Sequence, residues 1–409
     1  MRFIAGGRKG NQFHTPLVGP SRSIRVIHDR VDPTSVAQEP ATAARGRLSH
    51  RVVTLDDGHK VGITVGGRGV PLVFLHGIAL SGKAYVRLLS RLAGMGFHVV
   101  ALDAAGHGVT PNLPRAAADL THRVDLTLRA LDALGVRKAV FMGHSMGGRM
   151  IIQLAAVAPE RVLAAVLLNA AAGSPFDQSI RPPVRSPRRV ARAMLNAAYD
   201  APGDPRRLPG RDRNRYVRQM TAALARNVRT PLGLPGAVRA IVTSGDYTPM
   251  LDAMREHHVP TIVVHGERDL VVPFENARDM ADHADATLYR VPGAYHSWML
   301  AHPRQGADMM RQLLAAELGE VLCDAAREHG AGDAVWWDEL LTADSSLRRL
   351  GEEPVDADPG EVFAPVDMDR LRSAHRVPRD TSCERRRRWW STWRRNRRVR
   401  SSARSADIA

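Results

Sequence analysis

Cysteine is almost absent from this sequence, which contains only Cys323 and Cys383 in 409 residues. The two lie far apart, and neither has a His or Cys neighbour at the spacing of metal ligands. This scarcity argues against a disulfide framework and a zinc site, and we expect neither a metal nor an organic cofactor. A reducing compartment suits such a chain, so we predict a cytoplasmic protein.

Long apolar runs are also lacking. Residues 1–12 contain no apolar segment of the kind found in secretion signals. No uninterrupted apolar stretch approaches the roughly 18 residues that a bilayer-spanning helix needs. The sequence therefore predicts neither export nor a membrane span.

Acidic residues are missing from residues 385–404, which contain ten arginines. This segment supplies more than half of the formal net charge of +16. Trp389, Trp390 and Trp393 are interleaved with the arginines, a combination that suits an anionic membrane surface better than nucleic acid. Two interpretations stay open: peripheral membrane contact added to catalysis, and a solvated, disordered basic terminus.

The remaining chain is long enough for one sizeable core with appended segments. Residues 1–48 mix Arg, Gly, Pro and Ser without helical or strand periodicity, which predicts a flexible lead-in. Residues 51–55 and 61–65 are rich in strand formers and flank an Asp-Asp-Gly turn, which predicts a hairpin.

Short apolar runs bounded by turn residues then recur, and each predicts a buried strand. They are residues 70–75, 97–102, 139–142, 162–168, 261–264 and 286–291. Helix-like apolar spacing occupies residues 120–134, 146–157 and 309–318. The alternation of strand and helix predicts a largely parallel sheet with helices on both faces.

The strongest motif follows the strand predicted at residues 139–142. It is a G-x-S-x-G sequence centred on Ser145, and a helix-like stretch comes directly after it. A nucleophile elbow holds its serine in a strained turn and leaves no room for side chains two positions before or after it. Gly143 and Gly147 meet this requirement, so we predict that Ser145 is a nucleophile.

A nucleophilic serine needs a base, and the base needs an orienting carboxylate. Asp269 follows one predicted strand and His296 follows the next, so both belong to the sheet edge that carries Ser145. We predict that Ser145, His296 and Asp269 form a catalytic triad, with Glu267 as the alternative acid.

The oxyanion of an acyl-transfer intermediate needs backbone N–H donors. Met146 N–H comes directly after the nucleophile and is the first candidate. The loop after the strand at 70–75 supplies the second, for which we choose Ile78 N–H. His76, and the Asp103 to Gly108 loop with its His107, are predicted to have structural roles.

Five ordered motifs resemble the α/β-hydrolase superfamily over about residues 49–318. They are His76-Gly77, Asp103 to Gly108, Gly143 to Gly148, Gly266 to Pro273 and Gly293 to His296. The resemblance implies an α/β fold with a mostly parallel eight-stranded sheet, helices on both faces and a helical cap between strands six and seven. That cap coincides with residues 175–258, where 15 arginines against 7 acidic residues replace the strand signals.

The predicted organisation is therefore a core with four further segments. The core comprises residues 49–174 and 259–318, the lead-in 1–48, the cap 175–258, a C-terminal extension 319–380 and the basic tail 381–409. The sequence assigns no role to the extension and makes no prediction of an oligomeric state.

The superfamily contains many reactions, so the fold leaves the substrate open. A serine at the elbow favours acyl chemistry, and we predict a serine hydrolase, similar to carboxylesterases and lipases, that cleaves an ester or thioester of a small acyl substrate through an acyl-enzyme. One alternative is a carbon-carbon hydrolase or a lyase of the menaquinone-pathway type, in which Arg149 and a cap arginine hold a substrate carboxylate. The other interpretation of Arg149 is a side chain that faces solvent or pairs with a helix neighbour. The other alternative function is a ligand-binding protein on the same fold that does not turn over.

Overall fold

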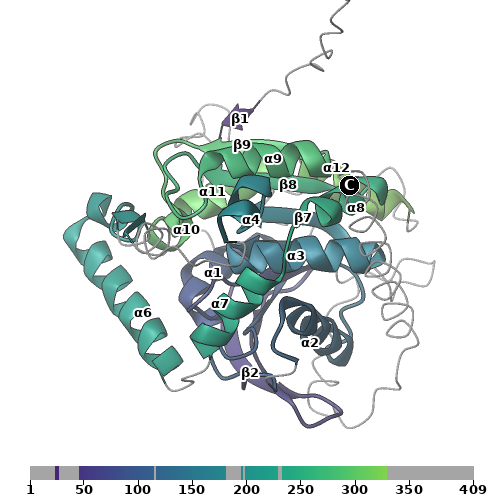
Figure 1. Ribbon diagram of the computed structural model, residues 1–409, viewed down its shortest axis with the longest axis horizontal. Coiled ribbons are helices and arrows are strands. Elements are labelled where there is room, and N and C mark those ends of the chain that lie inside the picture. The colour runs from purple at the N-terminus through teal and green to yellow at the C-terminus, as the bar shows by residue number, and fades with distance from the viewer. Residues whose placement is uncertain are drawn as a thin grey trace, which may run out of the picture.

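The computed structural model describes residues 24–26, 46–114, 117–180, 195–196, 199–228 and 233–328. Nine strands of these segments form one sheet (Figure 1). They are β1 (Arg25–Val26), β2 (Leu48–Thr54), β3 (Lys60–Gly66), β4 (Val70–Leu75), β5 (Phe97–Leu102), β6 (Ala139–His144), β7 (Val162–Leu168), β8 (Thr261–Gly266) and β9 (Thr287–Val291).

The strand order across the sheet is β1-β9-β8-β7-β6-β4-β5-β3-β2. β3 pairs antiparallel with β2 and β5, and every other neighbouring pair is parallel. β2 to β9 are the eight strands that the sequence predicts, so the mostly parallel α/β architecture is confirmed. Their carboxyl-terminal ends place the loops after β4, β6, β8 and β9 at one edge of the sheet.

Helices cover both faces of the sheet (Figure 1), which is why the central strands β4 to β8 are buried along their whole length. One face packs against α2 (Leu120–Ala133), α3 (Met146–Val157), α8 (Thr248–Glu256) and α9 (Phe274–Ala284). The other packs against α1 (Val86–Met95), α10 (Trp298–Ala301), α11 (Pro303–Leu314) and α12 (Glu317–Glu328).

The N-terminal lead-in contains one strand that was not predicted from the sequence. β1 extends the sheet beyond β9, and Arg25 Nη1 lies 2.5 Å from Glu317 Oε1. Two residues are too few to show a period-2 pattern, so only the long-range pairing with β9 reveals this strand. Residues 1–23 and 27–45 of the predicted lead-in lie outside the described residues.

The predicted end of the core at residue 318 is too early. α12 continues to Glu328 and buries Leu318, Leu322 and Cys323 in the core. The helical stretch predicted at 309–318 is also two helices, because α11 ends at Leu314 before α12 begins. The remainder of the extension and the whole basic tail lie outside the described residues.

The described part of the segment between β7 and β8 is largely helical. It contains α4 (Ser174–Ile180), the 3-10 turn η4 (Pro205–Arg207), α6 (Gly210–Val228), α7 (Gly233–Thr243) and α8. Figure 1 shows α6 along one side of the molecule. α8 packs against α3 and α9 in the core layer, so the predicted cap boundary at 258 is too late.

Within the described segments, no helix is long and apolar enough to cross a lipid bilayer.

Candidate active site

The backbone at Ser145 has the geometry expected of a nucleophile elbow. Ser145 joins β6 to α3 with φ 53° and ψ −115°, a conformation that is costly for a residue with a side chain. A Cβ at Gly147 would lie 2.1 Å from the Leu75 carbonyl oxygen, and one at Gly143 would lie 2.5 Å from Ile151 Cδ1. Both positions therefore require glycine to bring α3 close to the sheet.

Asp269 and His296 come together at the same edge, from the loops after β8 and β9. His296 Nδ1 donates a hydrogen bond to Asp269 Oδ2 over 2.8 Å. All three predicted triad residues are nearly buried, with Ser145 6%, Asp269 4% and His296 8% exposed. The His144 ring, next to Ser145 in sequence, lies 4.9 Å from the His296 ring, so the imidazole is adjacent to the elbow. Ser145 Oγ itself forms no hydrogen bond with a described residue.

Several donors stabilise the Asp269 carboxylate. Oδ1 accepts the backbone N–H groups of Val271 and Val272, each at 2.8 Å. Oδ2 accepts Asn169 Nδ2 at 2.7 Å, and Asn169 is held in turn by Trp298 Nε1. Asn169 was not predicted from the sequence, although its position directly after β7 places it at the functional edge.

A second histidine also faces this carboxylate, because His265 Nε2 lies 3.2 Å from Asp269 Oδ2. Burial acts to raise the pKa of Asp269, but the charge of His296 and the hydrogen bonds from His265 and His296 outweigh it and hold the pKa well below its ordinary value. For His296, burial acts to lower the pKa and the Asp269 charge raises it, with a net increase. Asp269 therefore stays ionised and favours the imidazolium form of His296.

Glu267, the alternative acid, lies on the surface instead. Its carboxylate is 2.7 Å from Arg290 Nη1 and accepts the Gly293 N–H at 2.8 Å. These contacts hold Glu267 away from His296, so the arrangement favours Asp269 as the orienting acid.

The two predicted oxyanion donors are available. Among the described residues, neither Ile78 N–H nor Met146 N–H has an acceptor. Ile78 belongs to a loop fixed by two histidines: Ala104 N–H donates to His76 Nε2 at 2.9 Å, and Ala79 N–H donates to His107 Nε2 at 3.2 Å.

These two histidines are neutral and stabilise the loop. Burial lowers the pKa of His76 to about 4 and, together with the neighbouring His76, lowers that of His107 to about 3. Asp103 shapes its own loop by accepting the Val109 N–H at 3.4 Å, and it also accepts the Gly82 N–H at 2.9 Å. Each side chain has the structural role predicted for it.

A buried hydrogen-bond chain that the sequence did not predict joins the oxyanion loop to the histidine loop. Tyr85 is the last residue of the 3-10 turn η1 (Gly82–Tyr85). Its hydroxyl oxygen lies 2.7 Å from His144 Nδ1 and accepts the Gly77 N–H at 3.2 Å. His144 Nε2 lies 2.9 Å from the His296 carbonyl oxygen. Because that carbonyl can only accept, Nε2 carries the proton and Nδ1 accepts from the Tyr85 hydroxyl.

Two buried carboxylates from the segment between β7 and β8 hold the same histidine loop. Asp200 accepts the N–H of His296 at 3.1 Å and that of Leu270 at 2.9 Å. Asp204 accepts the Tyr295 N–H at 3.2 Å. Burial raises the pKa of both, that of Asp204 to about 7, and the nearby carboxylates add to the shift. The surrounding sequence carries no motif, so these residues were not predicted.

Arg149, which the lyase interpretation uses to hold a substrate carboxylate, cannot do so. It is 0% exposed, and its Nη1 lies 2.5 Å from Oδ1 of Asp177, which is 1% exposed. Its guanidinium also stacks 3.5 Å above the Tyr247 ring and donates to the Gly245 carbonyl. The role that the lyase alternative gives to Arg149 is therefore wrong, because its charge is already neutralised inside the core.

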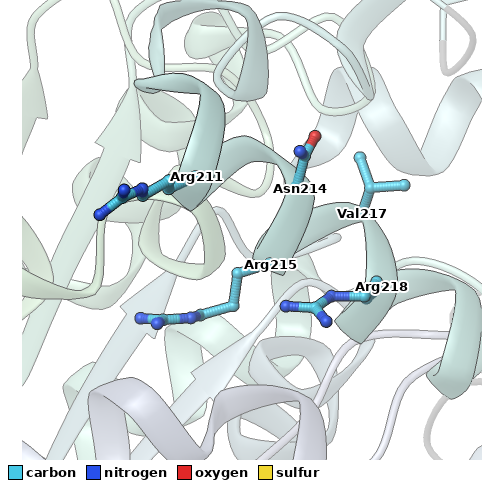
Figure 2. A pocket seen from close by; sticks show the side chains of 5 residues that line it. All are labelled: Arg211, Asn214, Arg215, Val217 and Arg218. Carbon is cyan, nitrogen blue, oxygen red and sulfur yellow. The ribbon is translucent and has the colours of Figure 1, made fainter.

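A pocket on α6 is separate from this site. Figure 2 shows the guanidinium groups of Arg211, Arg215 and Arg218 extending in the same direction from the helix, with Asn214 and Val217 beside them. None of the predicted triad residues lines it. In the described segments, no group of three or more His, Cys, Asp or Glu residues is arranged to hold a metal ion.

Comparison with known proteins gives consistent results. Residues 70–303 match the family model described as the alpha/beta hydrolase fold. A protein of Mycobacterium phage D29, named as a non-heme haloperoxidase, is 41% identical over 268 residues, which cover 64% of this chain and 94% of that protein. The bifunctional esterase/perhydrolase DCH of Acinetobacter calcoaceticus is 28% identical over 222 residues, or 51% of this chain and 78% of that protein. Among solved structures, the esterase RhEst1 of Rhodococcus sp. ECU1013 has a TM-score of 0.51 and 22% identity, covering 66% of this chain and 99% of that chain, and so shows the fold.

Proposed function

Because the chain belongs to the α/β-hydrolase family, we propose that it is a serine hydrolase that cleaves a carboxylic ester or thioester, with Ser145 as its nucleophile. One observation carries this proposal: His296 is hydrogen-bonded to an ionised Asp269 beside a serine held in a strained elbow. Strain of this kind is retained where function requires it.

The proposed reaction has two steps that share one imidazole. His296 Nε2 takes the Ser145 Oγ proton while Oγ attacks the substrate carbonyl, and the N–H groups of Ile78 and Met146 bind the oxyanion. His296 then gives that proton to the departing alcohol oxygen or thiol sulfur, which leaves an acyl-serine. Water attacks the acyl-serine with His296 again as base, and the acid is released as Ser145 regains its proton.

The names of relatives favour perhydrolysis as a second candidate reaction, which uses the same acyl-serine intermediate. The chain is similar to proteins named as haloperoxidases and as an esterase/perhydrolase. In that reaction hydrogen peroxide replaces water, so its oxygen bonds to the acyl carbon and the products are a peracid and free Ser145. Peracid formation from an ester and hydrogen peroxide, absent in Ser145→Ala, would support this activity, whereas hydrolysis alone would contradict it.

The basic tail is a separate proposal. We propose that residues 381–409 add contact with an anionic membrane, because three tryptophans are interleaved there with runs of the ten arginines. Truncation after Asp380 should abolish salt-sensitive binding to vesicles containing phosphatidylserine and leave ester hydrolysis intact. Vesicle binding that survives truncation would contradict the proposal.

The experiment that tests the main proposal is hydrolysis of a chain-length series of p-nitrophenyl esters and acyl thioesters. Wild type is compared with Ser145→Ala and with the exposed control Ser179→Ala, and fluorophosphonate adducts are located by mass spectrometry. We expect turnover and labelling in wild type and Ser179→Ala, and neither in Ser145→Ala. Ligand binding by folded wild type without turnover or labelling would overturn the proposal in favour of a non-catalytic binding protein.

A further inference from the structure

Arg123, in the first turn of α2, is a buried cation that forms no ion pair with a carboxylate of the described residues. Its side chain is 2% exposed, and it donates one hydrogen bond, from Nη1 to the Ala105 carbonyl. Its Nε is enclosed and has no acceptor. No described carboxylate forms an ion pair with Arg123, since the nearby Asp119 binds His122 instead.

This arrangement is unusual because a charge moved out of water is costly unless an opposite charge or several acceptors surround it. Arg149, on the neighbouring helix α3, meets that requirement through Asp177 and three neutral acceptors. Burial lowers the pKa of Arg123 to about 10, so its guanidinium remains charged at neutral pH. A guanidinium that is not neutralised in this position can bind an anion.

The guanidinium lies next to the oxyanion loop. The Ala105 carbonyl that accepts from Arg123 also accepts from His107 Nδ1 at 3.1 Å. Through its other nitrogen, His107 binds the N–H of Ala79, the residue after Ile78. The positive charge of Arg123 also contributes to the low pKa of His76 and His107, as expected for neighbouring groups.

Glycine leaves space on the other side of the guanidinium. α7 lies beside α2 (Figure 1), and a Cβ built at Gly236 of α7 would be 3.5 Å from Arg123 Nη2. That separation is an ordinary van der Waals contact, so any longer side chain at 236 would occupy the space in front of Nη2.

The remaining donor of the guanidinium defines the ligand chemistry. Nη1 is engaged by Ala105 and Nε is enclosed, which leaves Nη2, opposite Gly236, as the donor that can bind a carboxylate oxygen. Resting on the proposed hydrolase activity, we propose that Arg123 binds a carboxylate on the acyl part of the substrate. The preferred substrates are then half-esters or half-thioesters of dicarboxylic acids.

The first test compares p-nitrophenyl half-esters of succinate, glutarate and adipate with uncharged p-nitrophenyl esters of the same chain length. We expect wild type to prefer at least one anionic ester about tenfold or more in kcat/KM, mainly through KM. Arg123→Met should lose this preference and keep turnover of the uncharged ester. Arg129→Met, on the same helix and paired with Asp57 at the surface, should keep it.

A second variant fills the space and leaves the charge in place. Gly236→Leu should lose the preference for anionic esters, whereas Gly210→Leu, where a Cβ meets nothing, should keep it. Because α7 tolerates leucine better than glycine, this variant tests the subsite even if Arg123→Met does not fold. Retention of the preference in Gly236→Leu would overturn the subsite.

The remaining outcomes separate the subsite from the proposed function. Uncharged esters turned over through Ser145, with no wild-type preference for anionic ones, would overturn the subsite and leave the hydrolase intact. Absence of any Ser145-dependent turnover or labelling would overturn the hydrolase itself. Free acetate could instead activate turnover of uncharged esters while half-esters are not preferred. This outcome would show that Arg123 binds an anion from solution, and it would overturn the role of Arg123 in substrate choice.

Discussion

Three buried carboxylates surround His296, and they come from two different regions of the chain. Asp269 belongs to the core loop after β8, whereas Asp200 and Asp204 belong to the segment between β7 and β8. The interactions of Asp269 hold its pKa below the ordinary value, while burial raises the pKa of Asp200 and Asp204. Carboxylates of one chemical type, around one histidine, thus have opposite shifts.

The difference lies in the donors, because burial acts on all three carboxylates in the same direction. Asp269 accepts two backbone N–H groups, the Asn169 amide and His296, and also faces His265. Asp204 accepts a single N–H, that of Tyr295. The core therefore stabilises an anion that the chemistry needs, whereas the intervening segment uses its carboxylates to fix the backbone of the histidine loop.

Asp269→Asn is expected to have the largest effect, because it removes the ionised carboxylate of the core region. The amide would present a donor where His296 Nδ1 needs an acceptor, which disfavours the tautomer required of the base. We expect kcat for ester hydrolysis to fall by about 10⁴ with the fold retained in circular dichroism spectra. The control is Glu267→Gln, whose carboxylate lies on the surface beside Arg290 and whose loss should change kcat less than twofold. A loss below tenfold in Asp269→Asn would remove it from the proposed triad.

Asp200→Asn tests the contribution of the other region. One of its two acceptor oxygens would become an amide donor facing the N–H groups of His296 and Leu270. We expect kcat at pH 8 to fall about tenfold with KM little changed, because a displaced imidazole loses reaction geometry.

The same variant has a readout that a purely structural role would not move. The Asp200 charge acts to raise the pKa of His296, so its removal should shift the acidic limb of the kcat/KM profile to lower pH. Asp212→Asn, a more exposed position on α6, should leave both quantities unchanged. An unaltered kcat in Asp200→Asn would show that Asp269 and its donors position His296 without help.

Tyr85→Phe tests whether an uncharged hydrogen-bond chain also positions His296. The change deprives His144 Nδ1 of its donor and Gly77 N–H of its acceptor, so both the His296 carbonyl and the oxyanion loop lose support. We expect kcat to fall about three- to fivefold, and the free energy of unfolding by about 1–3 kcal/mol for the unpaired groups. Steady-state kinetics and urea unfolding measure the two effects. The exposed control Tyr199→Phe should alter neither, and equal behaviour of the two variants would contradict a positioning role for Tyr85.

The difference between the core loops and the segment between β7 and β8 also explains which site residues could be predicted from the sequence. Short apolar runs and G-x-S-x-G are local patterns, so the parallel strands and the turn at Ser145 follow from them. The order of loops after successive parallel strands brings Asp269 and His296 to the same edge. Asp200, by contrast, hydrogen-bonds to a backbone N–H 96 residues away, and no local pattern encodes such a contact. Arg123 is hidden for a related reason, since only burial distinguishes it from the other arginines.

The smallest predicted effect concerns stability, through Asp204→Asn. Burial first, and then the charges of Asp200 and Asp269, raise the Asp204 pKa from the ordinary 3.8 to about 7, against the opposing influence of Arg207 and the Tyr295 N–H. The folded protein thus binds this proton more tightly than the unfolded chain. The contribution of Asp204 to the free energy of unfolding is complete below about pH 4 and is lost as the pH rises through 7.

Asn cannot ionise and still accepts the Tyr295 N–H, so Asp204→Asn should gain stability over wild type as the pH rises. We expect this difference in the free energy of unfolding to grow by about 1–3 kcal/mol between pH 5 and pH 8, measured by urea unfolding, with kcat changed less than twofold. Asp324→Asn, at an exposed position on α12, should show no such pH dependence. A difference that is constant with pH would mean that Asp204 ionises at its ordinary pKa, and the contrast between the two regions would then rest on Asp200 alone.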